Sequence, residues 1–560
     1  MSDESTAREF GRVARATGVV GSLTFLSRIS GLARDIVIGY LLGAQSAADA
    51  FFVAFRIPNL LRRLTAEGAL SAGFVPVLSE YLATRGRREA IEASRTIVTF
   101  AVLCLILLTA AGVLFPSPLT RLFAPGFAAV PEKFSLTVQL VRIMFPAIFF
   151  VSLVALAMGY LNTFRHFMAP SLAPVLLNLA IIAAAFLLIP MLSQPVMSLA
   201  YGVLLGSVAQ LLFQLPFLHR YGFSWRPSLD FRSPALLRFQ RLMGPAVVGA
   251  AVYQLNVLVS TILASLLEPG SVSYLYYADR LLQFPLGVFA VALGTAALPS
   301  FSLLAARNDV AGLRTTLGYS LRLVNFISLP SALGLMVIAV PAFSLLFQRG
   351  AFSADDVQAS ARALVFLALG LWAVSATRVL VPLFHSMQDT RTPVRVAFWT
   401  FVLNLFLSVM LMGPVAAVQG DSPFAAAVAA LSGAIGVLSL SYAGLALANS
   451  LSATFQFAAL MWLVTRRLGG FAWREYLSSL WRNLAAATIM AAPLLLAAGR
   501  MQWAPGSGTL PLQVLSFIAL VAGGVALYAT AARLLRSPDW LVARNLGIAL
   551  MERFPIRVKT

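Results

Sequence analysis

The 560-residue chain has little charge, cysteine, lysine or histidine. Only 11% of its residues are charged, whereas a soluble globular protein carries roughly 25%. The single cysteine, Cys104, lies in an apolar run, where we expect it to pack in the interior, and it excludes a disulfide within one chain. The cysteine and the three histidines show no metal-ligand spacing, so the sequence predicts no metal and no other cofactor.

Apolar residues make up 59% of the chain. A helix needs about 20 mainly apolar residues to cross a bilayer, and uncharged runs such as 100–115 disfavour the alternative of a large soluble protein with buried helices. The sequence predicts an all-α integral membrane protein with about fourteen transmembrane helices. The expected spans are 17–41, 48–82, 94–116, 136–161, 172–192, 196–219, 240–267, 272–305, 317–347, 358–386, 394–416, 438–465, 477–499 and 511–534.

The net charge of +20 comes almost entirely from arginine, because Lys133 and Lys559 are the only lysines. A basic soluble protein would suggest a nucleic-acid partner, but here the arginines alternate between successive connections, as the positive-inside rule requires. Arginines crowd the connections after even-numbered spans, whereas the opposite connections hold few cations: Arg121, Lys133, Arg349 and Arg500. We therefore expect no nucleic-acid partner, a multi-pass membrane protein, and both termini in the cytoplasm.

The two halves of the sequence match when one is shifted by about 223 residues. Gly73–Pro76 then aligns with Ala296–Pro299, and Leu122-Phe123 aligns with Leu346-Phe347. An even number of spans per repeat predicts two parallel six-helix bundles, as in transporters whose substrate binds between the halves. The expected domains are a cytoplasmic tail at 1–14, bundles at 15–220 and 236–467, helices 13 and 14 at 475–535, and a cytoplasmic tail at 536–560. Residues 417–437 form either a long periplasmic loop or a re-entrant segment.

Ionisable residues inside spans cost about 2.5–3.5 kcal/mol on insertion scales, so they need a partner or a function. They occupy spans 1, 2, 8 and 10: Arg28, Arg34, Asp35, Asp49, Arg56, Arg62, Arg63, Glu67, Asp279, Arg280 and Arg378. One interpretation is an arginine-lined cavity for a phosphate or pyrophosphate ligand, and the other is mutual neutralisation. We favour neutralisation for Arg56, Arg63 and Glu67. We favour ligand binding for Arg28, Arg34 and Arg62, because Glu67 alone cannot neutralise them all.

Helix geometry limits how these charges meet. Arg28 and Arg34 are six residues apart, or about 120° around a regular helix, so they share one stripe only if the helix bends. Gly31 lies between them and would allow such a bend. Proline residues mark further expected kinks at Pro58, Pro76, Pro285 and Pro299.

Several long motifs rich in charged membrane residues carry a family resemblance. They are Ser27–Asp35, Asp49–Arg63, Ala66–Ala69, Tyr277–Leu281, Ala292–Thr295 and Gln388–Pro393. From about residue 17 to residue 535 the chain closely resembles the MviN/MurJ family of the multidrug/oligosaccharidyl-lipid/polysaccharide exporter superfamily. The resemblance implies a lipid II flippase, which is a transporter and not an enzyme. Its substrate would be the undecaprenyl-pyrophosphate-linked peptidoglycan precursor, carried from the cytoplasmic to the periplasmic leaflet.

The resemblance also implies which residues matter. It places essential cavity charges at Arg28, Arg34, Asp49, Arg62 and Arg280. Among the other charges inside the spans, we expect Asp35, Glu67, Asp279 and Arg378 to support them. It implies that spans 13 and 14 form a groove for the lipid tail, and it makes the bilayer and the cell-wall synthesis machinery candidate partners. Gln283 departs from relatives that have Glu there. The absence of Asp and Glu from 240–267 argues against a sodium site like that of some relatives.

We expect alternating access, in which the bundles rock about the bound head group. The membrane potential would assist, since one charge crossing 100 mV is worth about 2.3 kcal/mol. The alternatives are an exporter of another polyprenyl-linked oligosaccharide, a drug exporter of the same superfamily, and a membrane enzyme acting on polyprenyl phosphate. A cation-drug exporter should present acids rather than arginines, and the enzyme should present a carboxylate cluster. The sequence has no GxxxxGK[ST] loop, so it is not a primary pump by itself.

Overall fold

The computed structural model describes residues 3–62, 71–223, 225–415, 423–501, 503 and 510–540, with backbone alone for 3–20, 71–72, 245–246, 248–253, 288 and 291. Within these residues the chain forms helices and no strands. It divides into two compact units, one holding the chain up to Val272 with the segment Gly350–Phe352, and the other holding most of the remainder.

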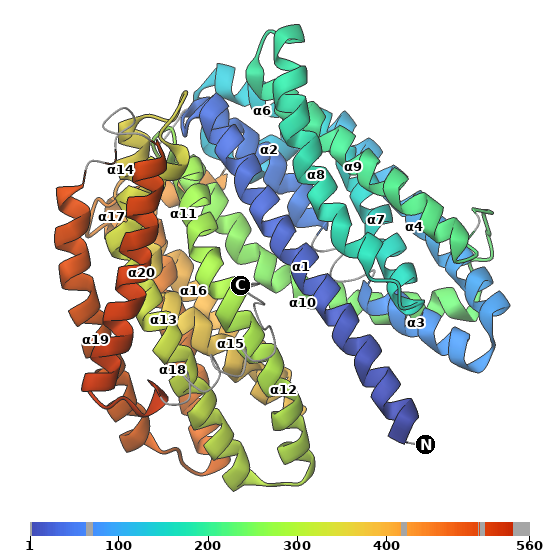
Figure 1. Ribbon diagram of the computed structural model, residues 1–560. Coiled ribbons are helices and arrows are strands. Elements are labelled where there is room, and N and C mark those ends of the chain that lie inside the picture. The colour runs from blue at the N-terminus through green and yellow to red at the C-terminus, as the bar shows by residue number, and fades with distance from the viewer. Residues whose placement is uncertain are drawn as a thin grey trace, which may run out of the picture. The chain divides into compact units, whose positions relative to one another are not determined.

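The helices of the first unit follow the apolar runs of the sequence. They are α1 (Asp3–Leu42), α2 (Ser46–Arg62), α3 (Ser71–Thr84), α4 (Arg87–Leu114), α5 (Pro116–Phe123), α6 (Pro131–Met144), α7 (Ala147–Thr163), α8 (Met168–Leu187), α9 (Pro195–Arg220) and α10 (Pro234–Ser265), with short helical turns at Pro125–Ala129 and Ile189–Met191. Helices α1, α8 and α9 pack side by side (Figure 1). The helix α1 runs unbroken through Gly31 and includes most of the expected N-terminal tail.

The second unit contains most of the remaining helices, except that the first two residues of α11 and the first turn of α17 belong to the first unit. They are α11 (Ser271–Pro285), a π-helical turn (Leu286–Ala290), α12 (Val291–Ala306), α13 (Val310–Phe347), α14 (Ala354–Ala368), α15 (Leu371–Ser386), α16 (Arg391–Met412), α17 (Pro423–Ile435), α18 (Tyr442–Leu468), α19 (Trp473–Arg500) and α20 (Leu510–Leu534). The red helices α19 and α20 lie together and pack against α13 (Figure 1). Aromatic and aliphatic side chains such as Phe326, Met490 and Tyr528 fill the space between these three helices.

Two expected spans are interrupted. The span 272–305 changes to π-helix directly after Pro285, as expected for a residue that lacks an N–H and clashes with the preceding turn. The span 358–386 is bent by 45° between α14 and α15, which the sequence did not indicate. At that bend, a Cβ on Gly370 would lie 2.7 Å from the Cα of Ser450, so α15 and α18 approach closely there because the residue is glycine.

The segment after α16 was expected to be a loop or a re-entrant piece. Residues 416–422 lie outside the described part of the chain, and 423–435 form the helix α17. Beyond it, the backbone N–H groups of Val437, Leu440 and Ser441 donate to the carbonyls of Met410, Leu411 and Met412. These bonds satisfy carbonyls in the last turn of α16 that have no partner within a helix.

The outer surface is apolar, as a bilayer requires. Large apolar side chains stand exposed on several helices, including Leu107 (72%), Leu187 (71%) and Val525 (66%), and so many exposed apolar side chains are typical of a surface that faces lipid. Nine helices within the described residues are long and apolar enough to cross a bilayer, or ten if α14 and α15 form one span. Cys104 is exposed on α4, so the expectation that it packs in the interior is wrong; an apolar thiol needs no protein partner in lipid.

Candidate functional site

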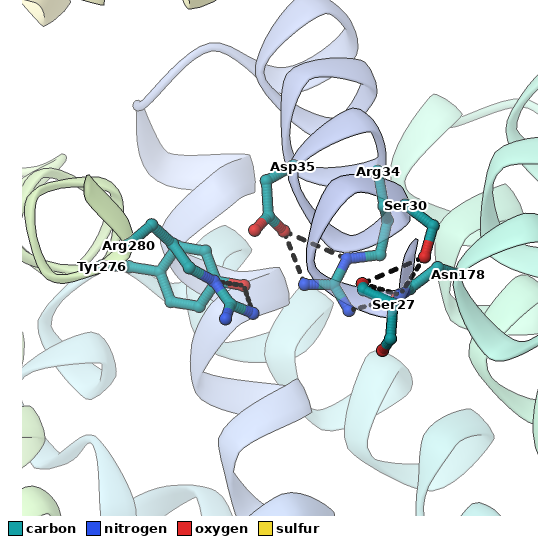
Figure 2. Close-up of polar contacts among 7 residues, drawn as sticks. All are labelled: Ser27, Ser30, Arg34, Asp35, Asn178, Tyr276 and Arg280. Carbon is teal, nitrogen blue, oxygen red and sulfur yellow. Dashed lines mark hydrogen bonds and ion pairs between the residues drawn. The ribbon is translucent and has the colours of Figure 1, made fainter. Parts of the chain in front are cut away.

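Arg34 of α1 is held by a carboxylate on its own helix and an amide on another (Figure 2). Its side chain is 5% exposed. Its Nε and Nη2 atoms donate to Oδ1 of Asp35 at 3.0 and 2.6 Å, and its Nη1 atom donates to Oδ1 of Asn178 at 3.1 Å. A buried guanidinium is tolerable only when it is paired and hydrogen-bonded. The ion pair with Asp35 balances the charge of Arg34 within α1, whereas the sequence analysis favoured ligand binding for this arginine.

Asn178, which the sequence analysis missed, joins α8 to α1. Its Nδ2 atom donates to Oγ of Ser30 at 3.0 Å and to the carbonyl of Ser27 at 3.3 Å (Figure 2). An ideal Cβ on Gly31 would lie 3.5 Å from this amide nitrogen, so the glycine faces α8. Ser27, Ser30 and Arg34 of the motif therefore contact a single asparagine of α8. Arg28 lies outside this contact and is half-buried.

Asp49, at the start of α2, is 1% exposed and is held by two groups distant in sequence. Lys133 Nζ of α6 lies 2.8 Å from its Oδ2 atom, and the backbone N–H of Gly270 donates to the same atom at 2.7 Å. The Lys133 ammonium also lies 4.0 Å from the ring centre of Phe127, a favourable cation–π distance. The sequence analysis placed Lys133 in a connection outside the spans and missed this partner.

The charges of α2 are spread along the helix instead of forming one cluster. Asp49 and Arg62 are thirteen residues apart, or about 20 Å at 1.5 Å per residue. Between them, Arg56 donates to the hydroxyl of Thr261 on α10. Arg62 is half-buried and donates to Oδ1 of Asn59 at 3.0 and 2.8 Å. Arg63 and Glu67 lie outside the described residues.

In the second unit, Arg280 of α11 rests on an aromatic side chain of the preceding turn (Figure 2). Its guanidinium lies 5.1 Å from the ring centre of Tyr276, and its Nη2 and Nε atoms lie 2.9 and 3.3 Å from the Tyr276 hydroxyl. Arginine remains protonated in proteins. Because the tyrosine hydroxyl is neutral, this contact does not balance the positive charge of Arg280. The adjacent Asp279 is exposed and accepts a hydrogen bond from the Gln283 amide, which a glutamate at that position could not donate.

Arg378 is exposed on α15, where α12 comes so close that a Cβ on Gly294 would lie 2.3 Å from the Arg378 carbonyl.

The structure also draws attention to two arginines inside expected spans that the sequence analysis overlooked. Arg322 of α13 lies 3.6 Å from Asp539 and 3.5 Å from Glu475. Arg362 of α14 is exposed and lines a cavity. Within the described residues, no group of three His, Cys, Asp or Glu side chains could hold a metal ion.

The motif Gln388–Pro393 forms the turn between α15 and α16. Asp389 accepts from the Thr392 hydroxyl at 2.7 Å and from the backbone N–H groups of Thr392 and Arg391 at 3.0 and 3.1 Å. It also pairs with Arg467 at the end of α18. Hydrogen bonds from the Thr392 side chain and backbone, followed by Arg467, hold the pKa of Asp389 at about 2, below its ordinary 3.8. The motif thus joins the turn between α15 and α16 to the end of α18.

Within the described residues the structure is helical, with many apolar spans and with arginines and carboxylates inside expected spans, which is typical of a polytopic membrane transporter. The family model described as "Lipid II flippase MurJ" matches residues 38–420 and 421–514. A probable lipid II flippase MurJ of Vibrio cholerae is 41% identical over 405 residues, which cover 71% of this chain and 77% of the relative. A lipid II flippase MurJ of Burkholderia cenocepacia is 40% identical over 409 residues, covering 71% and 79%. The chain belongs to the MurJ family of lipid II flippases.

Solved structures share the fold. A lipid II flippase MurJ in an inward closed conformation aligns with a TM-score of 0.73 and 24% identity, covering 92% of this chain and 99% of that protein. An inward-facing multidrug resistance MATE family transporter of the MOP superfamily aligns with a TM-score of 0.64 and 16% identity, covering 80% and 98%. At these identities the likeness establishes the helical transporter fold.

Proposed function

We propose that the chain moves lipid II, the undecaprenyl-pyrophosphate-linked peptidoglycan precursor, from the cytoplasmic to the periplasmic leaflet of the bacterial cytoplasmic membrane. The observation that carries this proposal is the family match over most of the chain, together with relatives named lipid II flippases at 41% and 40% identity. The flipped precursor would supply cell-wall synthesis, so the cell-wall synthesis machinery is the protein partner that we propose.

The proposed substrate site consists of five charged residues: Arg28, Arg34, Asp49, Arg62 and Arg280. Their different surroundings suggest two roles, which are contact with the substrate and support of the helices. Arg28, Arg62 and Arg280 are half-buried, so part of each side chain remains accessible to a pyrophosphate. Arg34 and Asp49 lie in buried ion pairs. We assign these two to holding the helices that carry the others, with Asp35 as the immediate support, and we retain Glu67, Asp279 and Arg378 as supporting charges.

We infer fourteen spans, arranged as two parallel six-helix repeats plus α19 and α20, with both termini cytoplasmic. At matching positions of the proposed repeat, the two halves share a common helix-ending turn. Arg165 and Gln388, 223 residues apart (388 − 165), both end a helix with positive φ, 60° and 58°. The N–H groups of Arg165 and His166 bond back to Asn162 and Leu161, and those of Gln388 and Asp389 bond back to His385 and Phe384, in the same spacing.

Lipid-facing helices fit the proposed groove for the undecaprenyl tail. In the most apolar 18-residue stretch of each helix, only 11% is buried in α20 and only 28% in α19. The two helices pack against α13 through the cluster that includes Phe326, Leu494 and Tyr528. They therefore offer a long apolar surface on which a polyprenyl chain would stay in contact with lipid while the head group crosses.

We propose alternating access assisted by the membrane potential. With the inside negative, an anionic head group gains energy on moving outward, and the empty cationic site is then drawn back inward. This coupling needs no dedicated ion. Collapse of the potential with an ionophore should slow the appearance of lipid II in the outer leaflet. An undiminished rate in the absence of a potential would rule out the coupling while leaving the substrate assignment intact.

Complementation tests the function directly. A bacterial host is depleted of its own flippase, this chain is expressed, and lipid II exposed at the outer leaflet is measured for the wild type and for Arg28→Ala, Arg280→Ala and the exposed control Arg500→Ala at matched membrane levels. We expect rescue by the wild type and the control only. Failure of the well-expressed wild type would favour another polyprenyl-linked substrate, and rescue by all variants would refute the arginine site.

A further inference from the structure

A cavity of about 510 Å³ opens on the second unit between α13, α14 and the start of α18. One wall is apolar and includes Met336 and Val340 of α13. The other wall is polar and is formed by Asp355, Gln358 and Arg362 of α14. The mixed lining distinguishes this cavity from the ordinary lipid-facing surface of α19 and α20.

The three polar residues lie on one face of α14. Asp355 and Arg362 are seven residues apart, which is nearly two full turns and about 10.5 Å along the axis, and Gln358 lies between them. All three side chains are exposed. Arg362 has no hydrogen-bond or ion-pair partner in the part of the chain that the structure describes. An arginine inside a spanning segment without a protein partner indicates a ligand or a water-filled surface.

The order of the lining residues along α14 matches that of a phospholipid. In the proposed orientation α14 begins at the periplasmic face, so Asp355 lies at the surface and Arg362 lies about 10.5 Å deeper. Helical side chains lean toward the helix N-terminus, which brings the guanidinium up toward the level of lipid phosphates. The apolar wall at Met336, Val340 and Val365 would then meet the acyl chains.

We propose that this cavity binds a zwitterionic, ethanolamine-type phospholipid of the periplasmic leaflet. Arg362 binds the phosphate, Asp355 binds the ammonium group, which in such a lipid lies farther from the acyl chains than the phosphate, and Gln358 bonds to either. An anionic phospholipid lacks the ammonium group and would leave Asp355 facing a like or neutral group. The proposal goes beyond lipid II transport and rests on the proposed orientation of the chain only for its choice of leaflet.

Binding of defined lipids to the purified full-length protein tests the proposal. Apparent dissociation constants for dioleoyl phosphatidylethanolamine and dioleoyl phosphatidylglycerol are measured by native mass spectrometry from detergent. The variants are Arg362→Gln, Arg362→Lys and Asp355→Asn. Arg500→Gln is the control, because Arg500 is also an exposed arginine but ends α19 and lies outside the cavity. Thermal unfolding in the same detergent shows that each variant is folded.

We expect Arg362→Gln to weaken binding of both lipids about tenfold or more, since charge-assisted hydrogen bonds to phosphate are lost, and Arg362→Lys to weaken it less. Asp355→Asn should weaken the ethanolamine lipid selectively. Arg500→Gln should change neither. Unchanged binding in Arg362→Gln would overturn the site, and equal effects of Asp355→Asn on both lipids would overturn the zwitterionic occupant.

Glycerophosphoethanolamine, which has the head group without acyl chains, separates a lipid site from a head-group site. We expect it to compete poorly because it cannot use the apolar wall, and competition at the affinity of the intact lipid would overturn the lipid assignment. These binding readouts are independent of lipid II exposure in cells. Failure of this proposal therefore leaves the flippase function standing, and failure of the flippase function leaves the binding result standing.

Discussion

Lys133 Nζ lies 2.8 Å from the Asp49 carboxylate although 84 residues separate the two, and the Gly270 N–H bonds to the same oxygen. A single buried carboxylate thus joins the start of α2, the start of α6 and the connection that follows α10. In the proposed orientation all three points lie at the periplasmic face. Asp49 would therefore act by holding that face of the first unit together.

Removal of Lys133 should destabilise the protein severely. Breaking one partner of a buried ion pair costs about 3–5 kcal/mol, so we expect Lys133→Met to lower the thermal unfolding temperature sharply, whereas Lys133→Arg should lower it little. The charge swap Asp49→Lys with Lys133→Asp should recover only part of the loss, because it restores the ion pair but not the bond from Gly270. Full recovery by the swap would show that the Gly270 bond contributes nothing.

Asn178 should affect transport through Arg34. We expect Asn178→Ala to reduce lipid II exposure, because Arg34 Nη1 loses its acceptor and Ser30 loses its donor. In a double-mutant cycle with Arg34→Gln the effects should be non-additive by about 0.5–3 kcal/mol, as for residues in direct contact.

The matched control for Asn178→Ala is Asn404→Ala. Asn404 is also a buried asparagine in a span and donates to Ser452 at 3.1 Å, but it contacts no arginine in the described structure. The substitution Asn404→Ala should lower the stability of the protein without changing the transport rate per folded molecule. Additive effects of Asn178→Ala and Arg34→Gln on transport would separate Asn178 from the function of Arg34.

The Tyr276 ring and hydroxyl hold Arg280 in different ways, and substitutions separate them. Tyr276→Phe keeps the cation–π contact at 5.1 Å and removes the hydroxyl, whereas Tyr276→Leu removes both. We expect a small loss of transport with Phe and a larger, severalfold loss with Leu that stays smaller than the loss with Arg280→Ala, since a cation–π contact is worth about 0.5–2 kcal/mol. Lipid II exposure at matched expression measures both. Wild-type transport by Tyr276→Leu would show that Arg280 needs no such support.

The sequence predicts well those helices and helix breaks that depend on nearby residues in the chain. The apolar runs placed helices such as α8 and α13, and Pro285 indicated the break at 286–290. The bend at Gly370 could not be predicted, because it depends on the close approach of Ser450 from a distant helix. The fourteen-span count and the orientation stay predictions.

The candidate site was only partly predictable for the same reason. The charges inside spans were visible as residue types, but their partners Asn178 and Lys133 are an uncharged residue and a residue expected in a loop. A motif of charged residues indicates that a polar network exists, while the fold decides which distant residue completes it. Arg322 and Arg362 were within reach of the sequence, since both are cations inside expected spans.

The turn at Asp389 should make stability depend on pH below about 4. Its folded-state pKa of about 2 lies below the ordinary 3.8, chiefly because Thr392 donates two hydrogen bonds to the carboxylate and Arg467 pairs with it. A depressed pKa stabilises the folded state when the group is ionised, so this contribution is present above pH 3.8 and is lost as the pH falls toward 2.

Asp389→Asn removes this titration, so it should lower the unfolding temperature at pH 7 and have progressively less effect as the pH approaches 2. Unfolding in detergent, followed from pH 2 to pH 7 for the wild type and Asp389→Asn, gives the difference between the two curves. The control Asp230→Asn alters an exposed aspartate of the connection before α10, for which we expect little difference at any pH. A difference between wild type and Asp389→Asn that stays constant across this range would mean that the carboxylate charge does not hold the turn.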